Sequence, residues 1–362
     1  YRLTGSSVDL GINAALQFLP MLMFGAWAGA LADRFDRRRT TIVTQSLMAL
    51  QAIVLGICDV SGVISVELVF VLTGVLGLVG AIDNPSRRGL VTELVPAHEI
   101  GNAMSLNTAV MTGSRIFGPA LAASLVGPLG TGWLFIINGM SYVFMLYGVV
   151  GLRKSEMFTP ELRPAGGTPV RDGIRFVRTH RRLFPLFIVF SLVSTFAFNY
   201  GVSLPKLSDI QWGNAEYFGW VLAVTSIGSL VGALATARLH LTTYTWVAGA
   251  ALMLGVANVG MAIAPNVWVA FVWAIPLGAG GAAMIAGANS IITQEAPPEM
   301  RGRMLALTAV AFLGSTPIGG PITGLVADYV SVPWSLAYGG IITLLAAVFM
   351  FGWIWVKDIE HA

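Results

Sequence analysis

Long apolar stretches alternate with short polar segments along almost the whole chain. They lie at 8–31, 41–58, 64–82, 102–127, 132–152, 184–203, 217–237, 244–264, 267–287, 304–327 and 334–356. Each is close to the length of about 20 helical residues that crosses a hydrocarbon layer of about 30 Å. Because a backbone in hydrocarbon must satisfy its own hydrogen bonds, these stretches predict helices. The pattern therefore predicts an all-α polytopic membrane protein with eleven spans.

Composition agrees with this prediction. Residues of the set AVILMFWYC make up 56% of the chain and charged residues only 11%. A soluble domain carries about 25% charged residues, so this chain lacks the polar surface that a water-soluble protein needs.

The basic residues concentrate in alternate loops. All lysines and arginines except Arg2, Arg115 and Lys206 fall on one side of the predicted spans. Basic loops mark the cytoplasmic side, so we expect a multi-pass protein of the bacterial inner (plasma) membrane with a cytoplasmic carboxyl terminus. This placement explains the net charge of +3 without nucleic acid as a partner. An odd number of spans that starts outside predicts that a first helix is missing from this chain.

Two sequence matches relate the halves of the chain. Residues 25–32 (GAWAGALA) recur at 228–235 (GSLVGALA), an offset of 203. A second match, at an offset of 201, pairs Thr92, Pro96, Gly101, Leu106, Gly113, Ser114 and Gly118 with Thr293, Pro297, Gly302, Leu307, Gly314, Ser315 and Gly319. Such repeats are common in secondary transporters. We expect two pseudo-symmetric six-helix bundles, at 1–152 (helices 2–6 of a presumed twelve) and 184–362 (helices 7–12).

A polar linker at 153–183 separates the two predicted bundles. Within it Val170, Ile174 and Val177 recur at helical spacing among several arginines, which predicts a short amphipathic helix. Such a helix lies on the cytoplasmic leaflet, attracted by anionic membrane lipid. A solvated linker helix is the alternative.

The run at 29–39 (GALADRFDRRR) follows the first stretch. Gly25 and Gly29 form a small-xxx-small face that lets a neighbouring helix approach closely. Asp33 lies where helix gives way to loop, where a carboxylate can pair with an arginine or with the amino end of another helix. An ion pair of this kind can form in one conformation and break in the other.

This run resembles the signature of the major facilitator superfamily between its second and third helices. The matching residues are Gly29, Leu31, Asp33, Arg34, Arg37 and Arg38, with Asp36 where glycine is usual. The resemblance implies the major facilitator fold and a conformational latch at the cytoplasmic face, formed by Gly29, Asp33, Arg34, Arg37 and Arg38. The second half has Thr236 in place of the acid, so no latch is expected there. A charged stop after the helix, without a switching role, is the alternative.

Residues 84–96 (NPSRRGLVTELVP) and 118–121 (GPAL) resemble the branch of this superfamily that includes enterobactin exporters and macrolide efflux pumps. The resemblance implies efflux of a drug, antibiotic or siderophore-like small molecule by alternating access, as a proton-coupled antiporter. We expect a monomer without a cofactor. The single cysteine, Cys58, excludes an internal disulfide and a cysteine-based metal site.

Polar residues inside the predicted spans are candidates for the wall of a substrate cavity. Asn107, Met111 and Arg115 share a helix face, and so do Asn13 and Gln17. Asn138, Asn199 and Asn258 are further candidates. The alternative for Arg115 is a structural pair with another helix, and single buried amides often join helices instead of binding ligands.

Acids suited to proton coupling are scarce, and Asp9 and Asp83 are the candidates. A proton carrier needs a pKa raised by desolvation towards the working pH. Three alternatives stay open: one of these acids is more deeply buried than its position suggests, the coupling acid is on the missing first helix, or protons are not coupled.

Other functions are weaker interpretations of the same sequence. A dedicated metabolite importer or uniporter of the same fold is the main alternative. A non-transporting membrane scaffold and an intramembrane enzyme are remote, since the four histidines are scattered and no H-E-x-x-H occurs. No phosphate-binding G-x-x-x-x-G-K-[ST] run occurs either, so we do not expect direct use of ATP.

Overall fold

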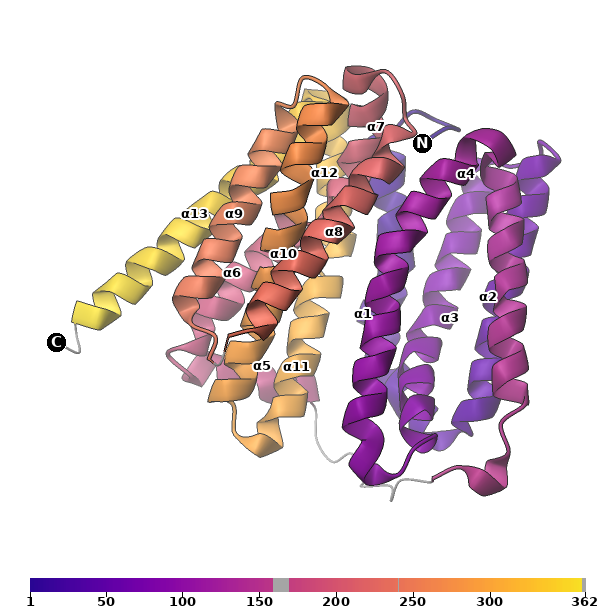
Figure 1. Ribbon diagram of the computed structural model, residues 1–362, viewed down its shortest axis with the longest axis horizontal. Coiled ribbons are helices and arrows are strands. Elements are labelled where there is room, and N and C mark those ends of the chain that lie inside the picture. The colour runs from indigo at the N-terminus through magenta and orange to yellow at the C-terminus, as the bar shows by residue number, and fades with distance from the viewer. Residues whose placement is uncertain (159–168, 240, 360–362) are drawn as a thin grey trace. The chain divides into compact units, whose positions relative to one another are not determined.

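The computed structural model describes residues 1–158, 169–239 and 241–359, and throughout these ranges it contains helices and no strand (Figure 1). It divides into two units. The amino-terminal unit is Ala15–Ala165, and the carboxyl-terminal unit combines Tyr1–Ala14 with Gly166–Ala362. The division falls inside the predicted linker. It also passes through the first helix, α1 (Ser7–Arg34), whose first residues belong to the carboxyl-terminal unit.

The amino-terminal unit contains most of α1 and three further long helices. These are α2 (Arg37–Val60), α3 (Val66–Glu93) and α4 (Ile100–Val150), with short helices at Ala97–Glu99 (η1) and Lys154–Glu156 (η2). Ser65 caps α3, because its side chain accepts a hydrogen bond from the Leu68 N–H.

The long helix α4 breaks at Gly130, whose φ of 77° is in the left-handed region that glycine tolerates. Its second part packs antiparallel along α2 (Figure 1). Gly132 lies against Val60, and Gly139 lies against Ala49 and Ile53. A Cβ at Gly139 would be 2.5 Å from Ile53, so glycine is needed for this close approach.

This break explains a difference from the sequence prediction. Among the described residues, ten candidate spans are long and apolar enough to cross a membrane, where we expected eleven. The predicted stretches 102–127 and 132–152 lie in the single helix α4, whose part Phe117–Val150 counts as one candidate. Gly130 nevertheless divides α4 into two helices, which match the two predicted stretches, so the lower count arises because the two helices join without a loop of several residues.

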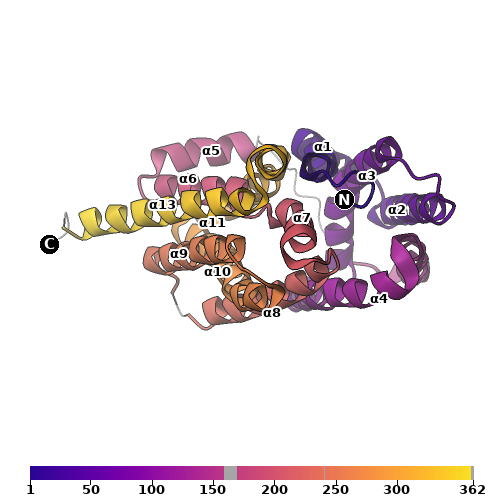
Figure 2. The same ribbon diagram turned by 90° about the horizontal axis from the view of Figure 1, so that it is seen from above.

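The carboxyl-terminal unit holds the remaining helices (Figures 1 and 2). They are α5 (Pro169–Thr179), α6 (Leu183–Phe196), α7 (Tyr200–Trp212), α8 (Tyr217–Ala237), α9 (Tyr244–Ala262), α10 (Val267–Glu295), α11 (Pro298–Leu313), α12 (Thr316–Leu325) and α13 (Val332–Ile359), with a π-helical turn at Val326–Val330. The helix predicted in the linker is α5, and it packs beside α6 and α11.

Two spans of this unit are discontinuous. Leu183–Trp212 consists of α6 and α7, which are separated at Ala197–Asn199. The candidate span Leu307–Val330 consists of part of α11, then α12 and the π-helical turn. Broken helices are tolerated inside a membrane where neighbouring protein satisfies the freed backbone groups.

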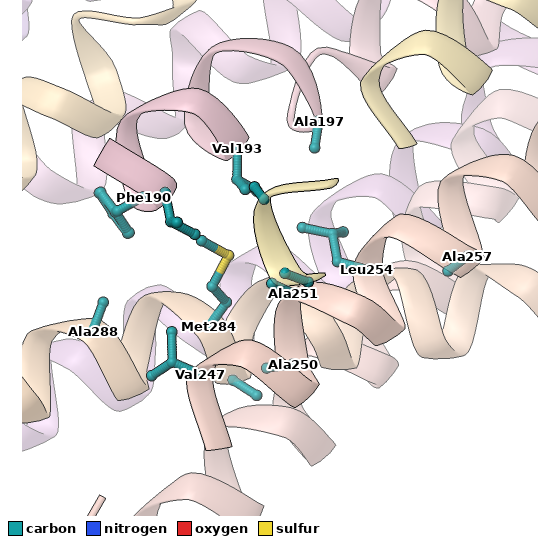
Figure 3. Close-up of a cluster of buried hydrophobic side chains, with 14 of the residues drawn as sticks. Phe190, Val193, Ala197, Val247, Ala250, Ala251, Leu254, Ala257, Met284 and Ala288 are labelled. Atoms are coloured by element: carbon teal, nitrogen blue, oxygen red, sulfur yellow. The ribbon is translucent and has the colours of Figure 1, made fainter. Parts of the chain in front are cut away.

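The core of this unit lies between α6, α9 and α10 (Figure 3). Phe190 of α6, Leu254 of α9 and Met284 of α10 are almost completely buried there. Small residues of α9, among them Ala250 and Ala251, bring the helices close enough for these larger side chains to interlock.

Glycines bring α8 and α10 into backbone contact. A Cβ at Gly232 would overlap the Ala279 carbonyl oxygen, and one at Gly278 would overlap the Thr225 oxygen. Gly77 of α3, which corresponds to Gly278 at the offset of 201, packs in the same way on α1, where its Cβ would be 2.6 Å from the Gln17 oxygen. The repeat read from the sequence is therefore also a repeat of helix contacts.

We expect Gly278→Ala to destabilise the protein by about 1–3 kcal/mol, because the new methyl group forces α8 and α10 apart. The measurement is the midpoint of thermal unfolding in detergent. Gly249→Ala is the matched control, since no atom lies within 4 Å of its added Cβ and the change favours helix. Equal midpoints for the two variants would contradict the role of backbone contact.

Candidate functional site

The signature run continues from the end of α1 into α2. Asp36 is the N-cap of α2, because its carboxylate accepts a hydrogen bond from the Arg39 N–H at 3.1 Å. It also forms an ion pair with Lys154 of η2. Burial alone would raise the pKa of this carboxyl, but the bonds from Lys154 and Arg39 lower it below its ordinary value. The acid that replaces the usual glycine therefore starts a helix, a role that our sequence reasoning missed although aspartate is a preferred N-cap.

The next two arginines join α2 to the ends of other helices. The Arg37 guanidinium donates to the Glu93 carboxylate at 3.0 Å, at the end of α3. Arg38 donates from Nε to the Val149 carbonyl oxygen at 2.9 Å and from its terminal nitrogen to that of Val150, at the end of α4. The two bonds from Arg38 satisfy backbone carbonyls in the last turn of α4, where partners within the helix are lacking.

The rest of the predicted latch stays a prediction. Gly29, Asp33 and Arg34 lie in the last turns of α1, and their side chains are outside the described part of the structure. Gly25, the other member of the small-xxx-small pair, has Met21 of its own helix as the one neighbour of its Cβ position among the described residues.

A buried polar cluster surrounds Asp83 in the middle of the amino-terminal unit. Asp83 is only 3% exposed. Its carboxylate accepts hydrogen bonds from Thr44 at 2.7 Å and Gln45 at 2.9 Å, both on α2, and from Arg87 one turn further along α3 at 3.3 Å. Asp83 is thus more deeply buried than its position near a span end suggested. Three converging donors satisfy the oxygens of this buried carboxyl group.

A second acid, Asp328, joins the π-helical turn to the first residues of α1 and to α7. Its carboxylate accepts hydrogen bonds from the Ser6 hydroxyl at 2.8 Å and from the backbone N–H groups of Ser7 and Val8 at 3.0 Å. Lys206 of α7 forms an ion pair with it at 2.5 Å. Asp328 therefore caps the amino end of α1, where the helix dipole favours a negative charge.

Neighbouring contacts strengthen the attachment of these first residues. The Tyr1 hydroxyl donates to Asp209 at 2.8 Å. Burial and this hydrogen bond raise the pKa of Tyr1 to about 12, so the phenol stays protonated at neutral pH. Gly11 contacts Gly320, and a Cβ there would be 2.5 Å from the Gly320 oxygen. The sequence could not reveal these contacts, because they join residues about 200 to 300 positions apart.

The predicted cavity residues of the amino-terminal unit fall into separate places. Asn107 donates to the Met111 sulfur at 3.8 Å, so these two share a face of α4 as expected. The Arg115 side chain is outside the described part of the structure, and Asn138 of α4 is exposed. Gln17 is also exposed on α1. These residues stay candidates for a cavity wall.

The remaining candidates belong to the carboxyl-terminal unit. Asn258 is buried and donates to the Leu254 carbonyl oxygen at 3.2 Å, and Asn199 is buried at the break between α6 and α7 and donates to Thr195. Asn13 is different, since its buried Oδ1 has no hydrogen-bond partner within the described residues. Asp9, in the first turn of α1, is half-buried. Among the described residues, no group of three or more histidine, cysteine or acidic side chains could hold a metal ion.

Residues 4–362 match a family model described as a transmembrane secretion effector of the MFS_3 type. The chain is 22% identical to the staphyloferrin A transporter of Staphylococcus aureus, over 96% of this chain and 88% of the relative. It is 24% identical to macrolide efflux protein A of Streptococcus pyogenes, over 95% of this chain and 87% of the relative. A crystal structure of a point mutant of the nucleoside transporter NupG has a similar fold, with a TM-score of 0.74 at 12% identity, and the match covers 96% of this chain and 90% of that one.

We expect a double-mutant cycle of Arg37→Gln and Glu93→Gln to give a coupling of about 1–2 kcal/mol, because the pair is a charge-assisted and partly buried hydrogen bond. The measurement is the unfolding midpoint of the two single variants and the double variant. Arg39→Gln is the control, since its exposed side chain makes no ion pair with Glu93. Additive effects of the two changes would contradict the pairing.

Proposed function

Since the chain belongs to the transmembrane secretion effector family of the major facilitator superfamily, we propose that it is a secondary active exporter of a small molecule. It is a multi-pass membrane transporter and not an enzyme. Export of a drug, antibiotic or siderophore-like metabolite is the function that we propose beyond this.

The direction and the substrate class rest on the similar proteins. One of them is an efflux protein for macrolides and another a transporter of the siderophore staphyloferrin A. At 22–24% identity neither relative assigns the substrate of this chain. We therefore propose the substrate class, a drug, antibiotic or siderophore-like metabolite, and test compounds of that class. Import or uniport is the alternative outcome of the same test.

The observation that best supports alternating access is that charged contacts lie at both ends of α1. Its first residues belong to one unit and the rest to the other. At its amino end Asp328 and Lys206 form a charged contact, and beyond its carboxyl end Arg37 pairs with Glu93. Ion pairs at helix ends can break and form again as a transporter changes state. We propose that Asp33 and Arg37 latch one face of the transporter and that Asp328 latches the opposite face.

Asp83 is the better of the two candidates for proton coupling. It is buried, and it shares its carboxylate with Arg87 and with two uncharged donors of α2. Protonation would remove the charge that attracts Arg87 and weaken the hydrogen bonds from Thr44 and Gln45, which join α3 to α2. Asp9 is only half-buried, at the start of α1.

The first test is accumulation of candidate substrates in a bacterium that lacks its own pumps and expresses the complete gene for this chain. Macrolides, tetracyclines, dyes and catecholate siderophores are followed with and without a protonophore. We expect severalfold lower accumulation of one class, and we expect the protonophore, Asp33→Asn or Asp83→Asn to abolish the effect.

Glu216→Gln is the matched control, because this acid is exposed at the start of α8. Higher accumulation in expressing cells would favour import. Unchanged accumulation for every class, with the protein present in the membrane, would reject export of these compounds.

The proposed latch at Asp328 has its own test. Ser7 is completely buried and its hydroxyl makes no hydrogen bond with any described residue, so Ser7→Cys in a Cys58→Ser background is a mild reporter. We expect Asp328→Asn to raise the rate of labelling of this cysteine by a membrane-impermeant maleimide about tenfold, because hydrogen bonds to a charged group are lost. Glu216→Gln should leave the rate unchanged. If Asp328→Asn also leaves it unchanged, Asp328 does not hold the end of α1.

A further inference from the structure

A groove opens on the carboxyl-terminal unit where α5 meets α6 and α11. Its volume is about 380 Å³, and its walls are mainly apolar side chains of these three helices. Arg178, in the last turn of α5, is the charged residue at its edge. Figures 1 and 2 show α5 beside α6, along the flank of the unit.

An exposed apolar stripe runs along this groove. Phe184, Ile188 and Leu192 recur every four residues on α6, and Phe184 is 43% exposed. Phe184 and Leu192 are eight residues apart, which is about 12 Å along a helix and within the ~15 Å depth of one leaflet of a bilayer. The stripe therefore accommodates an apolar chain that enters from the side of the membrane and stops near its middle.

The amino-terminal unit has a groove of the same kind between α2 and α3. Its volume is about 480 Å³. Arg39, Val43 and Leu47 follow one another at intervals of four residues along α2, and Val43 is 58% exposed. Again an arginine stands at the end of an exposed apolar stripe. The second groove arises from different helices and a different sequence, so its chemistry supports the first independently.

Both arginines are available to a ligand. Within the described residues, neither the Arg39 nor the Arg178 guanidinium has a hydrogen bond or an ion pair, and both side chains are exposed. Asp36 also lines the groove between α2 and α3 and attracts Arg39, but its carboxylate is paired with Lys154, which neutralises it. A guanidinium at the membrane surface is well suited to a phosphate, which it binds through two parallel N–H groups.

We propose that each groove binds one anionic phospholipid, with its phosphate on Arg178 or Arg39 and an acyl chain along the apolar stripe. An anionic headgroup would pair with the arginine of each groove, and an acyl chain as long as one leaflet is deep would cover its apolar stripe. The arginines lie in the basic segments that we expect at the cytoplasmic face, so the lipids come from that leaflet. This site is distinct from diffuse attraction of lipid to the whole basic linker. Of the two α5 arginines whose side chains the structure describes, Arg178 lines the groove and Arg175 does not.

The test is native mass spectrometry of the purified complete protein, titrated with phosphatidylglycerol or with the zwitterionic phosphatidylcholine. We expect two phosphatidylglycerol molecules to bind well above background, and Arg178→Gln and Arg39→Gln each to weaken one of them roughly tenfold. The double variant should lose both. Arg175→Gln is the matched control, with the same loss of charge on the same helix outside the groove.

A second variant tests the acyl chain separately from the charge. Ile188→Trp fills the α6 groove from an exposed position and should remove one lipid while the unfolding midpoint stays unchanged. Equal binding of phosphatidylcholine would overturn the proposal, because an apolar surface alone would then be sufficient. Equal loss in Arg175→Gln and Arg178→Gln would overturn it too, since the attraction would be diffuse.

Discussion

Close contact between helix backbones at glycine is the constraint on which both units depend. In hydrocarbon the apolar side chains gain nothing from leaving lipid, so helices associate through van der Waals contact and hydrogen bonds. Gly232 and Gly278 place α8 and α10 within reach of each other's carbonyls, and Gly77 does the same for α3 and α1. Gly280 has the same role between α10 and α9, where its Cβ would be 2.7 Å from the Leu254 nitrogen, beside the buried Leu254 and Met284 of the core.

Charged groups act mainly at the ends of these helices. Glu93 pairs with Arg37 at the start of α2. Asp36 and Asp328 accept hydrogen bonds from backbone N–H groups at the amino ends of α2 and α1, where the helix dipole adds to the attraction. Asp83 is the exception, since it is buried among helices. The free-energy cost of burying this carboxyl group is offset by hydrogen bonds from Thr44, Gln45 and Arg87, and a change of its charge would weaken all three bonds. The helices therefore pack against one another at glycines, whereas the ion pairs lie mainly at helix ends.

The sequence predicted the elements well and the contacts poorly. Apolar length located nearly every span, and the arginine-rich linker correctly indicated the amphipathic helix α5. At α4 a glycine with positive φ turns the chain without a polar loop, so the two predicted stretches are two helices that meet directly at Gly130. Asp36 was seen as a departure from a motif, although its side chain is what caps α2.

By itself the sequence determined that this chain spans a membrane, repeats itself and resembles the major facilitator superfamily, because these properties depend on residue type and spacing along the chain. The tertiary structure decided which groups meet. Asp328 reaches the start of α1, Arg37 reaches Glu93, and Asp83 is enclosed by α2. Burial and pairing are properties of neighbours in space, and the path of a helical chain brings together residues that no local pattern relates.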